Sequence, residues 1–355
     1  MSFLYFYSSK TLILEMSWTQ IESDPGVFTE MIQKFGVKNV QVVDVLGVTK
    51  EAFRSIGSPL GFIFLFKWKH NQNFEDGIVL EDKPPNLFFA EQKISNACAT
   101  QAILNLLLNI NDPEIVLGDE LTRFKDFSKN FSSDICGETI RNSAVIREVH
   151  NSFSRPEPFI MEETVAKEDD DVFHFTTFYP QFDENGEGGI IYELDGLKKG
   201  PILHTGFEGT KWLIELVSIL QNRINTYGTE LRFSLMAVIK DKRFVAKKKI
   251  EQLTKELNGM DEKITDKEEK TLTINKQIQE LSNLVEEEQS RMEMAYRENE
   301  RRRFNYIPFF IQLMKGISEK NMFSGLLEKA EEDMKIRLDK KKRKDELKKQ
   351  MEKKN

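Results

Sequence analysis

One apolar run, residues 61–68, most constrains how this chain can fold. Its sequence, Gly-Phe-Ile-Phe-Leu-Phe-Lys-Trp, places five apolar side chains in a row without alternation. A strand with one face in water alternates apolar and polar residues, so this strand must be buried on both faces. We therefore expect a central sheet with helices on each side.

The flanking sequence supplies both kinds of element. A first amphipathic helix is expected from Pro25 to Phe35, where Gly36 suits a C-terminal cap. Residues 17–241 are therefore expected to form one domain with mixed helices and strands. The remaining predicted strands are 172–178, 190–194 and 234–239, and the remaining predicted helices are 97–110, 138–150 and 211–226.

Two connections in this domain stand out. Residues 152–171 contain two prolines and an acidic stretch with no apolar period, which predicts a long exposed loop that is a lid, a binding segment or disordered. Residues 182–189, Phe-Asp-Glu-Asn-Gly-Glu-Gly-Gly, predict a polar hairpin between two strands.

The start of the chain, residues 1–16, lacks the basic region, the long apolar region and the cleavage site of a secretory signal, so we expect a loose extension. Two cysteines cannot build a disulfide framework, which predicts an intracellular, reduced protein. No apolar run approaches the roughly 20 residues of a membrane helix.

From about residue 244 the sequence becomes a Lys- and Glu-rich helix former. Its apolar residues recur at spacings of three and four, which predicts an antiparallel helix hairpin or a coiled coil. The turn falls at Asn258-Gly259 or at Thr271–Thr273. The apolar positions are Ile250, Leu253, Leu257, Met260, Ile264, Ile274, Ile278, Leu281 and Val285.

Basic and aromatic residues gather near the C-terminus. Residues 301–310, Arg-Arg-Arg-Phe-Asn-Tyr-Ile-Pro-Phe-Phe, are either core of a small domain or a docking face. Residues 335–355 carry eleven Lys or Arg against four Asp or Glu, a charge of +7, which leaves −14 for the rest of a chain of net charge −7. Such a basic tail is either solvated or binds nucleic acid or an acidic protein surface. We expect a helical partner-binding domain at 242–330 and a basic tail at 331–355.

Few side chains are suited to metal binding or nucleophilic chemistry. No CxxC or HxxxH pattern occurs, so neither a zinc site nor any other cofactor is expected. The full set of histidines and cysteines is His70, His150, His174, His204, Cys98 and Cys136.

Cys98 is the candidate nucleophile. It precedes an apolar helical stripe, with Ser95 or Asn96 as the expected N-cap, so it lies in the first helical turn. The helix dipole there would lower the pKa of the thiol. Gln92, six residues upstream, could donate its amide to an oxyanion together with the Cys98 backbone N–H. The alternative is a small buried apolar cysteine.

His174 and Asp195 are candidate partners of this cysteine. His174 lies among Val and Phe on one predicted strand, and Asp195 ends the next strand at 190–194, where it can accept a hydrogen bond from the ring. The alternatives are a core histidine with a satisfied hydrogen bond and a turn aspartate before Gly196.

Together these segments resemble the ubiquitin carboxyl-terminal hydrolase family of cysteine proteases. The resemblance spans about residues 17–330 and is closest to proteasome-associated members with an additional C-terminal helical domain. It rests on Phe-Phe-Ala-Glu-Gln-Lys-Ile-Ser-Asn-Ala-Cys-Ala-Thr-Gln-Ala-Ile at 88–103, Phe-His-Phe at 173–175, Tyr-Glu-Leu-Asp-Gly-Leu-Lys-Lys-Gly-Pro at 192–201, and the segments 18–28 and 301–306.

The resemblance implies roles for four residues. Cys98 would be the nucleophile, His174 the general base and acid, Asp195 the residue that orients His174, and Gln92 the oxyanion donor. The reaction would be hydrolysis of the amide or isopeptide bond after the C-terminal glycine of ubiquitin, through a thioester. The implied fold is α/β, of the papain-like α+β type: a central antiparallel sheet between helical lobes, a knotted backbone that departs from the general rule against knots, and a C-terminal all-helical domain.

The resemblance also implies partners. These are ubiquitin, the ubiquitin-receptor subunit of the proteasome 19S cap, which would bind the C-terminal domain, and a chromatin-remodelling complex. The protein would act in the cytoplasm and the nucleus. Binding to membranes or directly to nucleic acid is not expected. Residues 152–171 would align with the loop that crosses the active site. Two alternatives remain: a papain-like protease without ubiquitin specificity, and an inactive ubiquitin-binding scaffold, against which the complete set of four residues argues.

Overall fold

The computed structural model describes residues 18–67, 76–155, 173–209, 211–227, 233–259, 267–320 and 322–352. The expectations for residues 1–16, and for 156–171 of the predicted long loop, lie outside the described residues. The chain divides into two compact units, one ending at Arg303 and one beginning at Phe304. Each unit is described by itself.

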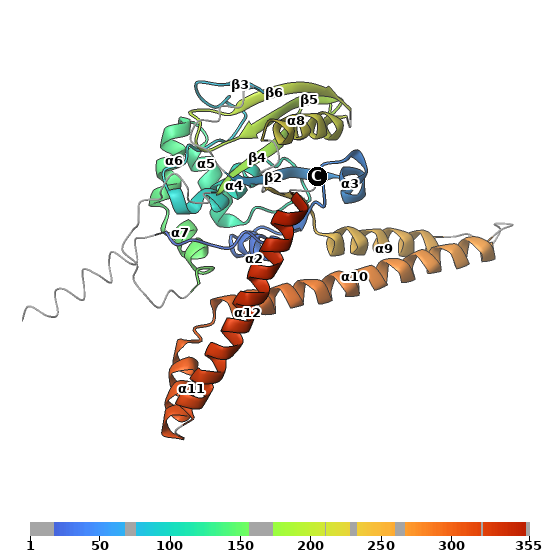
Figure 1. Ribbon diagram of the computed structural model, residues 1–355. Helices are drawn as coiled ribbons and strands as arrows, with labels where there is room; N and C mark the ends of the chain where they lie inside the picture. The colour runs from blue at the N-terminus through green and yellow to red at the C-terminus, as the bar shows by residue number, and fades with distance from the viewer. Residues whose placement is uncertain are drawn as a thin grey trace, which may run out of the picture. The chain divides into compact units, whose positions relative to one another are not determined.

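The first unit is built on a single antiparallel sheet of order β1-β7-β2-β4-β5-β6-β3 (Figure 1). Strand β2 contains most of the long apolar run, and Phe62, Ile63 and Phe64 are fully buried in it, which confirms the prediction of a strand covered on both faces. The strands are β1 Val40–Asp44, β2 Pro59–Lys67, β3 Ile78–Val79, β4 Phe173–Phe182, β5 Gly188–Leu194, β6 Ile202–Glu208 and β7 Phe233–Lys240.

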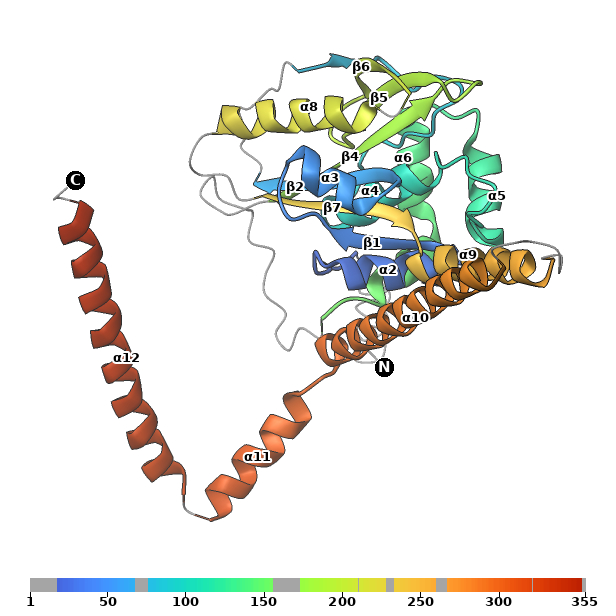
Figure 2. The same cartoon turned by 90° about the vertical axis from the view of Figure 1, so that its right-hand side faces the viewer.

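Helices cover both faces of the sheet (Figure 2). On one face, α3 and α8 pack on Phe64 and Phe178; on the other, α2 and α4 pack on Ile63 and Phe175. This arrangement confirms the predicted α+β fold with a central antiparallel sheet. The helices of this unit are α2 Pro25–Lys34, α3 Lys50–Ile56, α4 Cys98–Leu107, α5 Asp119–Ser128, α6 Ser133–Asn142, α7 Ala144–Asn151, α8 Trp212–Tyr227, α9 Lys242–Asn258 and α10 Lys267–Arg303.

Local side-chain hydrogen bonds decide two features of the chain path. The single helix predicted at 138–150 is wrong, because the Ser143 side chain accepts from the Ile146 N–H and starts α7 as a separate helix after α6. The predicted hairpin at 182–189 is confirmed: Asp183 Oδ1 accepts from the Glu187 N–H, and Gly186 supplies a φ of +71°.

The helices α9 and α10 form an antiparallel hairpin, as Lys242 at the start of α9 reaches Glu288 in the middle of α10. The first helix ends at Asn258, whereas Thr271–Thr273 lies inside α10, so the first of the two expected turn positions is confirmed.

Helix α10 is also bound to α2 in the first unit. Asn299, which is almost fully buried, donates to the Gly26 carbonyl at 3.1 Å and to Glu30 Oε2 at 2.8 Å, and Arg303 pairs with Glu30 at 3.0 Å. These contacts place α9 and α10 in the same compact unit as the sheet.

The second unit contains α11 Ile307–Glu319 and α12 Phe323–Glu352. The sequence allowed two interpretations of the aromatic residues at 301–310, as core of a small domain or as a docking face. These residues are exposed: Phe304, Phe309 and Phe310 are each 57–59% accessible. No helix among the described residues has the length and apolar character needed to cross a membrane.

Candidate active site

Cys98 is the first residue of α4. A 3-10 turn, Ser95–Ala97, leads directly into this helix, so the prediction of a first-turn cysteine is confirmed. The predicted N-cap is wrong, because Ala97 occupies the cap position and Asn96 instead donates to the Trp18 carbonyl at 3.1 Å. The rest of α4, residues 99–107, is buried.

The environment of the Cys98 thiol is different from the one predicted. Burial raises its pKa to about 11, although the N–H groups of Ala99 and Cys98 act in the opposite direction. The prediction of a lowered pKa is therefore wrong for the free protein. Loss of hydration outweighs the attraction of the helix start for a thiolate.

His174 and Asp195 meet as predicted. His174 Nε2 lies 2.6 Å from Asp195 Oδ1, and both side chains are buried. The same oxygen accepts from the Leu197 N–H at 2.9 Å, so the turn after β5 fixes the carboxylate. Because Nε2 faces a carboxylate, it carries a proton, and Nδ1 is left for another partner. Among the described residues, no hydrogen bond joins this nitrogen to Cys98.

Gln92 lies against the turn that contains Asp195. Its backbone N–H donates to the Gly196 carbonyl at 2.7 Å. A methyl group on Gly196 would approach Gln92 Cβ to 3.0 Å and Gln101 Nε2 to 3.2 Å, so the absence of a side chain at Gly196 permits this close approach. The segment before α4 is thus tied to the end of β5.

Cys136 has a different environment. It is fully buried in α6, and its Sγ donates to the carbonyls of Ser128 and Phe131 at 3.6 and 3.8 Å. Burial raises its pKa to about 11. Apolar side chains and backbone carbonyls surround Cys136, which indicates a structural role for this cysteine.

Comparison with known proteins decides the family. The model of ubiquitin carboxyl-terminal hydrolase, family 1, matches residues 18–225, and a second model for ubiquitin carboxyl-terminal hydrolases matches residues 278–323. The chain belongs to this family. Members of the family are cysteine-type deubiquitinating peptidases, and this chain is one of them.

Several relatives of this hydrolase align over most of their length. The chain is 38% identical to ubiquitin carboxyl-terminal hydrolase isozyme L5 of Dictyostelium discoideum, covering 89% of this chain and 96% of the relative. It is 39% identical to ubiquitin carboxyl-terminal hydrolase 2 of Schizosaccharomyces pombe, covering 89% and 97%. A crystal structure of Trichinella spiralis UCH37 bound to ubiquitin vinyl methyl ester matches with a TM-score of 0.59 and 32% identity, covering 78% of this chain and 99% of that one.

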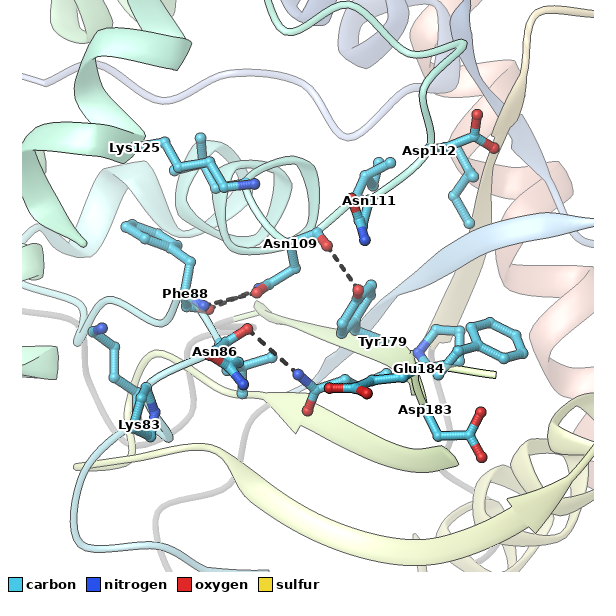
Figure 3. A pocket seen from close by; sticks show the side chains of 18 of the residues that line it. Lys83, Asn86, Phe88, Asn109, Asn111, Asp112, Lys125, Tyr179, Asp183 and Glu184 are labelled. Carbon is cyan, nitrogen blue, oxygen red and sulfur yellow. Dashed lines mark hydrogen bonds between the residues drawn. The ribbon is translucent and has the colours of Figure 1, made fainter. Parts of the chain in front are cut away.

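One pocket of this hydrolase lies away from these residues. A cavity of about 970 Å³ lies at the C-terminal end of α4, and Lys83, Lys125, Asn109 and Tyr179 are among the residues that line it (Figure 3). Asn109 already bonds both the N–H and the carbonyl of Phe88, and its own carbonyl accepts from the Tyr179 hydroxyl. Cys98 begins the opposite end of α4, so this pocket does not contain the candidate nucleophile.

Sequence reasoning missed a buried charged group beside the site. Glu193, only 2% exposed, lies two residues before Asp195 and pairs with Arg223 of α8. A signal for it was present, because an acidic residue between Tyr192 and Leu194 interrupts an otherwise apolar strand and must find a partner. The identity of that partner, thirty residues further along the chain, was not apparent from local patterns.

Proposed function

We propose that this hydrolase cleaves the amide or isopeptide bond after the C-terminal glycine of ubiquitin through a thioester on Cys98. The observation that carries the proposal is the buried His174–Asp195 pair, whose turn is bound to the Gln92 segment that leads into Cys98. Further support comes from the Trichinella spiralis relative, whose solved complex holds a ubiquitin vinyl methyl ester.

The chemistry begins with a protonated thiol. Because the pKa of Cys98 is raised to about 11, His174 has to take the proton through Nδ1 as the sulfur attacks the carbonyl carbon. Asp195 stabilises the resulting imidazolium. The Gln92 amide and the Cys98 backbone N–H donate to the oxyanion. His174 then returns the proton to the departing amine, which leaves a thioester.

Hydrolysis completes the cycle. His174 removes a proton from water, which attacks the thioester carbonyl, and the second tetrahedral intermediate collapses with release of the ubiquitin carboxylate. The proton on His174 returns to the sulfur and regenerates the thiol.

We also propose that the C-terminal region binds the ubiquitin-receptor subunit of the proteasome 19S cap and a chromatin-remodelling complex, in the cytoplasm and the nucleus. Support comes from the exposed apolar side chains of the second unit, among them Phe309, Phe310 and Met314. Apolar patches of this kind suit a protein partner.

A thiol-reactive ubiquitin probe tests the catalytic assignment. It should label Cys98, and Cys98→Ala should abolish turnover while ubiquitin binding stays measurable, since the thiol makes the covalent bond but little of a protein-sized interface. Cys136→Ala is the matched control and should keep wild-type turnover. Equal cleavage of a generic peptide would favour a papain-like protease without ubiquitin specificity, and absence of labelling would favour an inactive scaffold.

A further inference from the structure

Four charged side chains, three of them buried and Asp76 partly exposed, form a group between α8 and the sheet, which we call the α8 charge cluster: Asp76, Glu193, His204 and Arg223. Arg223 binds both Glu193 oxygens at 2.6 and 2.7 Å and both Asp76 oxygens at 2.8 and 2.9 Å. The Arg223, Glu193 and His204 side chains are each 1–2% exposed. In Figure 1, α8 lies along the strands β5 and β6 that carry two of these residues.

Hydrogen bonding shows that His204 in this cluster is charged. Its Nδ1 lies 2.8 Å from the Asp76 carbonyl and its Nε2 lies 2.9 Å from Glu193 Oε2. Both neighbours are acceptors, so both ring nitrogens must carry a proton. The cluster therefore contains two positive and two negative groups. Their charges balance, as buried charges require.

The pKa directions agree with this charge state. Burial alone would raise the pKa of the Glu193 carboxyl, but the Arg223 charge and the hydrogen bonds from Arg223 and His204 hold that pKa well below its usual range. Burial would likewise lower the pKa of His204, and its bond to Glu193 together with the Glu193 and Asp76 charges raises that pKa instead. Potential ligand atoms of Asp76, Glu193 and His204 lie close enough together for a metal ion, but Arg223 already donates to both carboxylates and supplies the positive charge in this group.

The cluster lies directly beside the His174–Asp195 pair. His174 and Thr176 are two residues apart on β4, and Glu193 and Asp195 are two residues apart at the end of β5, so all four lie on the same face of the sheet. Thr176 Oγ1 donates to Glu193 Oε1 at 3.0 Å, parallel to the hydrogen bond between His174 and Asp195. The Thr176–Glu193 bond thus fixes the two strands next to the position where the proposed catalytic pair must meet.

We propose that Arg223 and Glu193 are positioning residues that hold the end of β5 so that Asp195 keeps His174 in its reactive orientation. The inference rests on the proposed function, since it assigns a role within that reaction. The guanidinium fork fixes the direction of the Glu193 carboxylate from α8, and the Thr176 hydroxyl fixes it from β4. Asp195 lies one residue beyond the strand, so these two contacts of Glu193 also set the position of the Asp195 backbone.

Arg223→Lys tests the proposal because it keeps the charge and loses the fork, which a single ammonium cannot replace. With a fluorogenic ubiquitin C-terminal amide, we expect kcat to fall by on the order of tenfold to 100-fold with KM unchanged within about twofold. Thr176→Val should produce a smaller fall in the same direction. Arg243→Lys is the matched control: Arg243 also forks onto a carboxylate, Asp241, at the start of α9, and its substitution should leave kcat unchanged.

Alkylation of Cys98 by iodoacetamide supplies a second readout. In Arg223→Lys the pH profile of Cys98 alkylation should shift to higher pH. A misaligned Asp195 stabilises the His174 imidazolium less, so His174 takes the proton of the thiol less readily. A lower melting temperature with wild-type kcat and an unchanged alkylation profile would overturn the proposal, and so would a change confined to KM. If Arg223→Lys does not fold, Thr176→Val decides by the same two readouts. A wild-type protein that fails to cleave the substrate would instead refute the proposed function, while the alkylation profiles still test positioning.

Discussion

Gly137→Ala should reduce turnover although Gly137 lies in α6, outside the catalytic residues. A methyl group built on Gly137 would lie 2.0 Å from the Glu91 carbonyl oxygen and 3.1 Å from Lys93 Cγ. Real contacts of this kind stay above 3.0 Å, so the helix and the Glu91 backbone must separate by at least about 1 Å. Gln92, the next residue along, would move away from the position from which it is proposed to donate to the oxyanion.

The expected magnitude follows from this displacement. A shift of about 1 Å in a positioning group costs on the order of 100-fold in kcat. The effect on stability is smaller, because overpacking costs about 1–3 kcal/mol and alanine in a helix returns about 0.5–1 kcal/mol relative to glycine. For a domain of this size, the net change corresponds to a fall in melting temperature of a few degrees, roughly 2–4 °C per kcal/mol.

Steady-state kinetics on a ubiquitin C-terminal amide, with calorimetry of the same samples, measures both effects. Glu138→Ala is the matched control in the same helix, because Glu138 pairs only with Arg141 among the described ion pairs and should leave kcat unchanged. The pH profile of Cys98 alkylation in Gly137→Ala shows whether the displacement also reaches the turn after β5, because the Gln92 N–H is bonded to the Gly196 carbonyl there. A wild-type kcat with a lowered melting temperature would show that α6 moves instead, and would refute the coupling to Gln92.

Three further results are expected. Gln92→Ala should lower kcat by about 10²–10³ at nearly constant substrate affinity, as measured by steady-state kinetics, because one oxyanion donor is lost; a raised KM alone would place Gln92 in ground-state binding. Truncation after Arg303 should leave a folded, active hydrolase that no longer co-purifies with proteasomes. Truncation after Asp241 also removes the contacts of α10 with α2 and should lower the melting temperature. An unchanged melting temperature of this shorter protein would contradict a stabilising role of those contacts. The pH dependence of stability should have two opposing contributions. The pKa of His204 is raised in the folded protein, so its contribution to stability is complete below the unfolded pKa of about 6.5 and is lost as the pH rises through the folded pKa. Burial lowers the pKa of His150, so its contribution is present above about 6.5 and is lost as the pH falls towards the folded pKa. His204→Gln and His150→Gln should each remove the corresponding slope in melting curves recorded across pH.

Patterns local in sequence predicted much of this molecule. The apolar run around Phe64 required a doubly covered strand, and the pairing of the neighbouring strands β4 and β5 brings the His174 side chain to Asp195. The contacts that the sequence did not predict depend on distant parts of the chain. Burial of the Cys98 thiol comes from packing around α4, which reversed the expected direction of its pKa. Likewise, Arg223 reaches Glu193 across thirty residues, and no spacing rule indicates that pairing.

The burial of α4 has a consequence for how this enzyme can be regulated. Residues 99–107 lie entirely inside the first unit, so their amide hydrogens should exchange only through global unfolding, at the slow limit of the whole domain. Cys98, the proposed nucleophile, is therefore the first residue of an element that we expect to have no independent local opening. We therefore expect an activator or inhibitor that leaves the domain folded to act through the His174 and Asp195 strand ends or through the segment that carries Gln92, without moving α4.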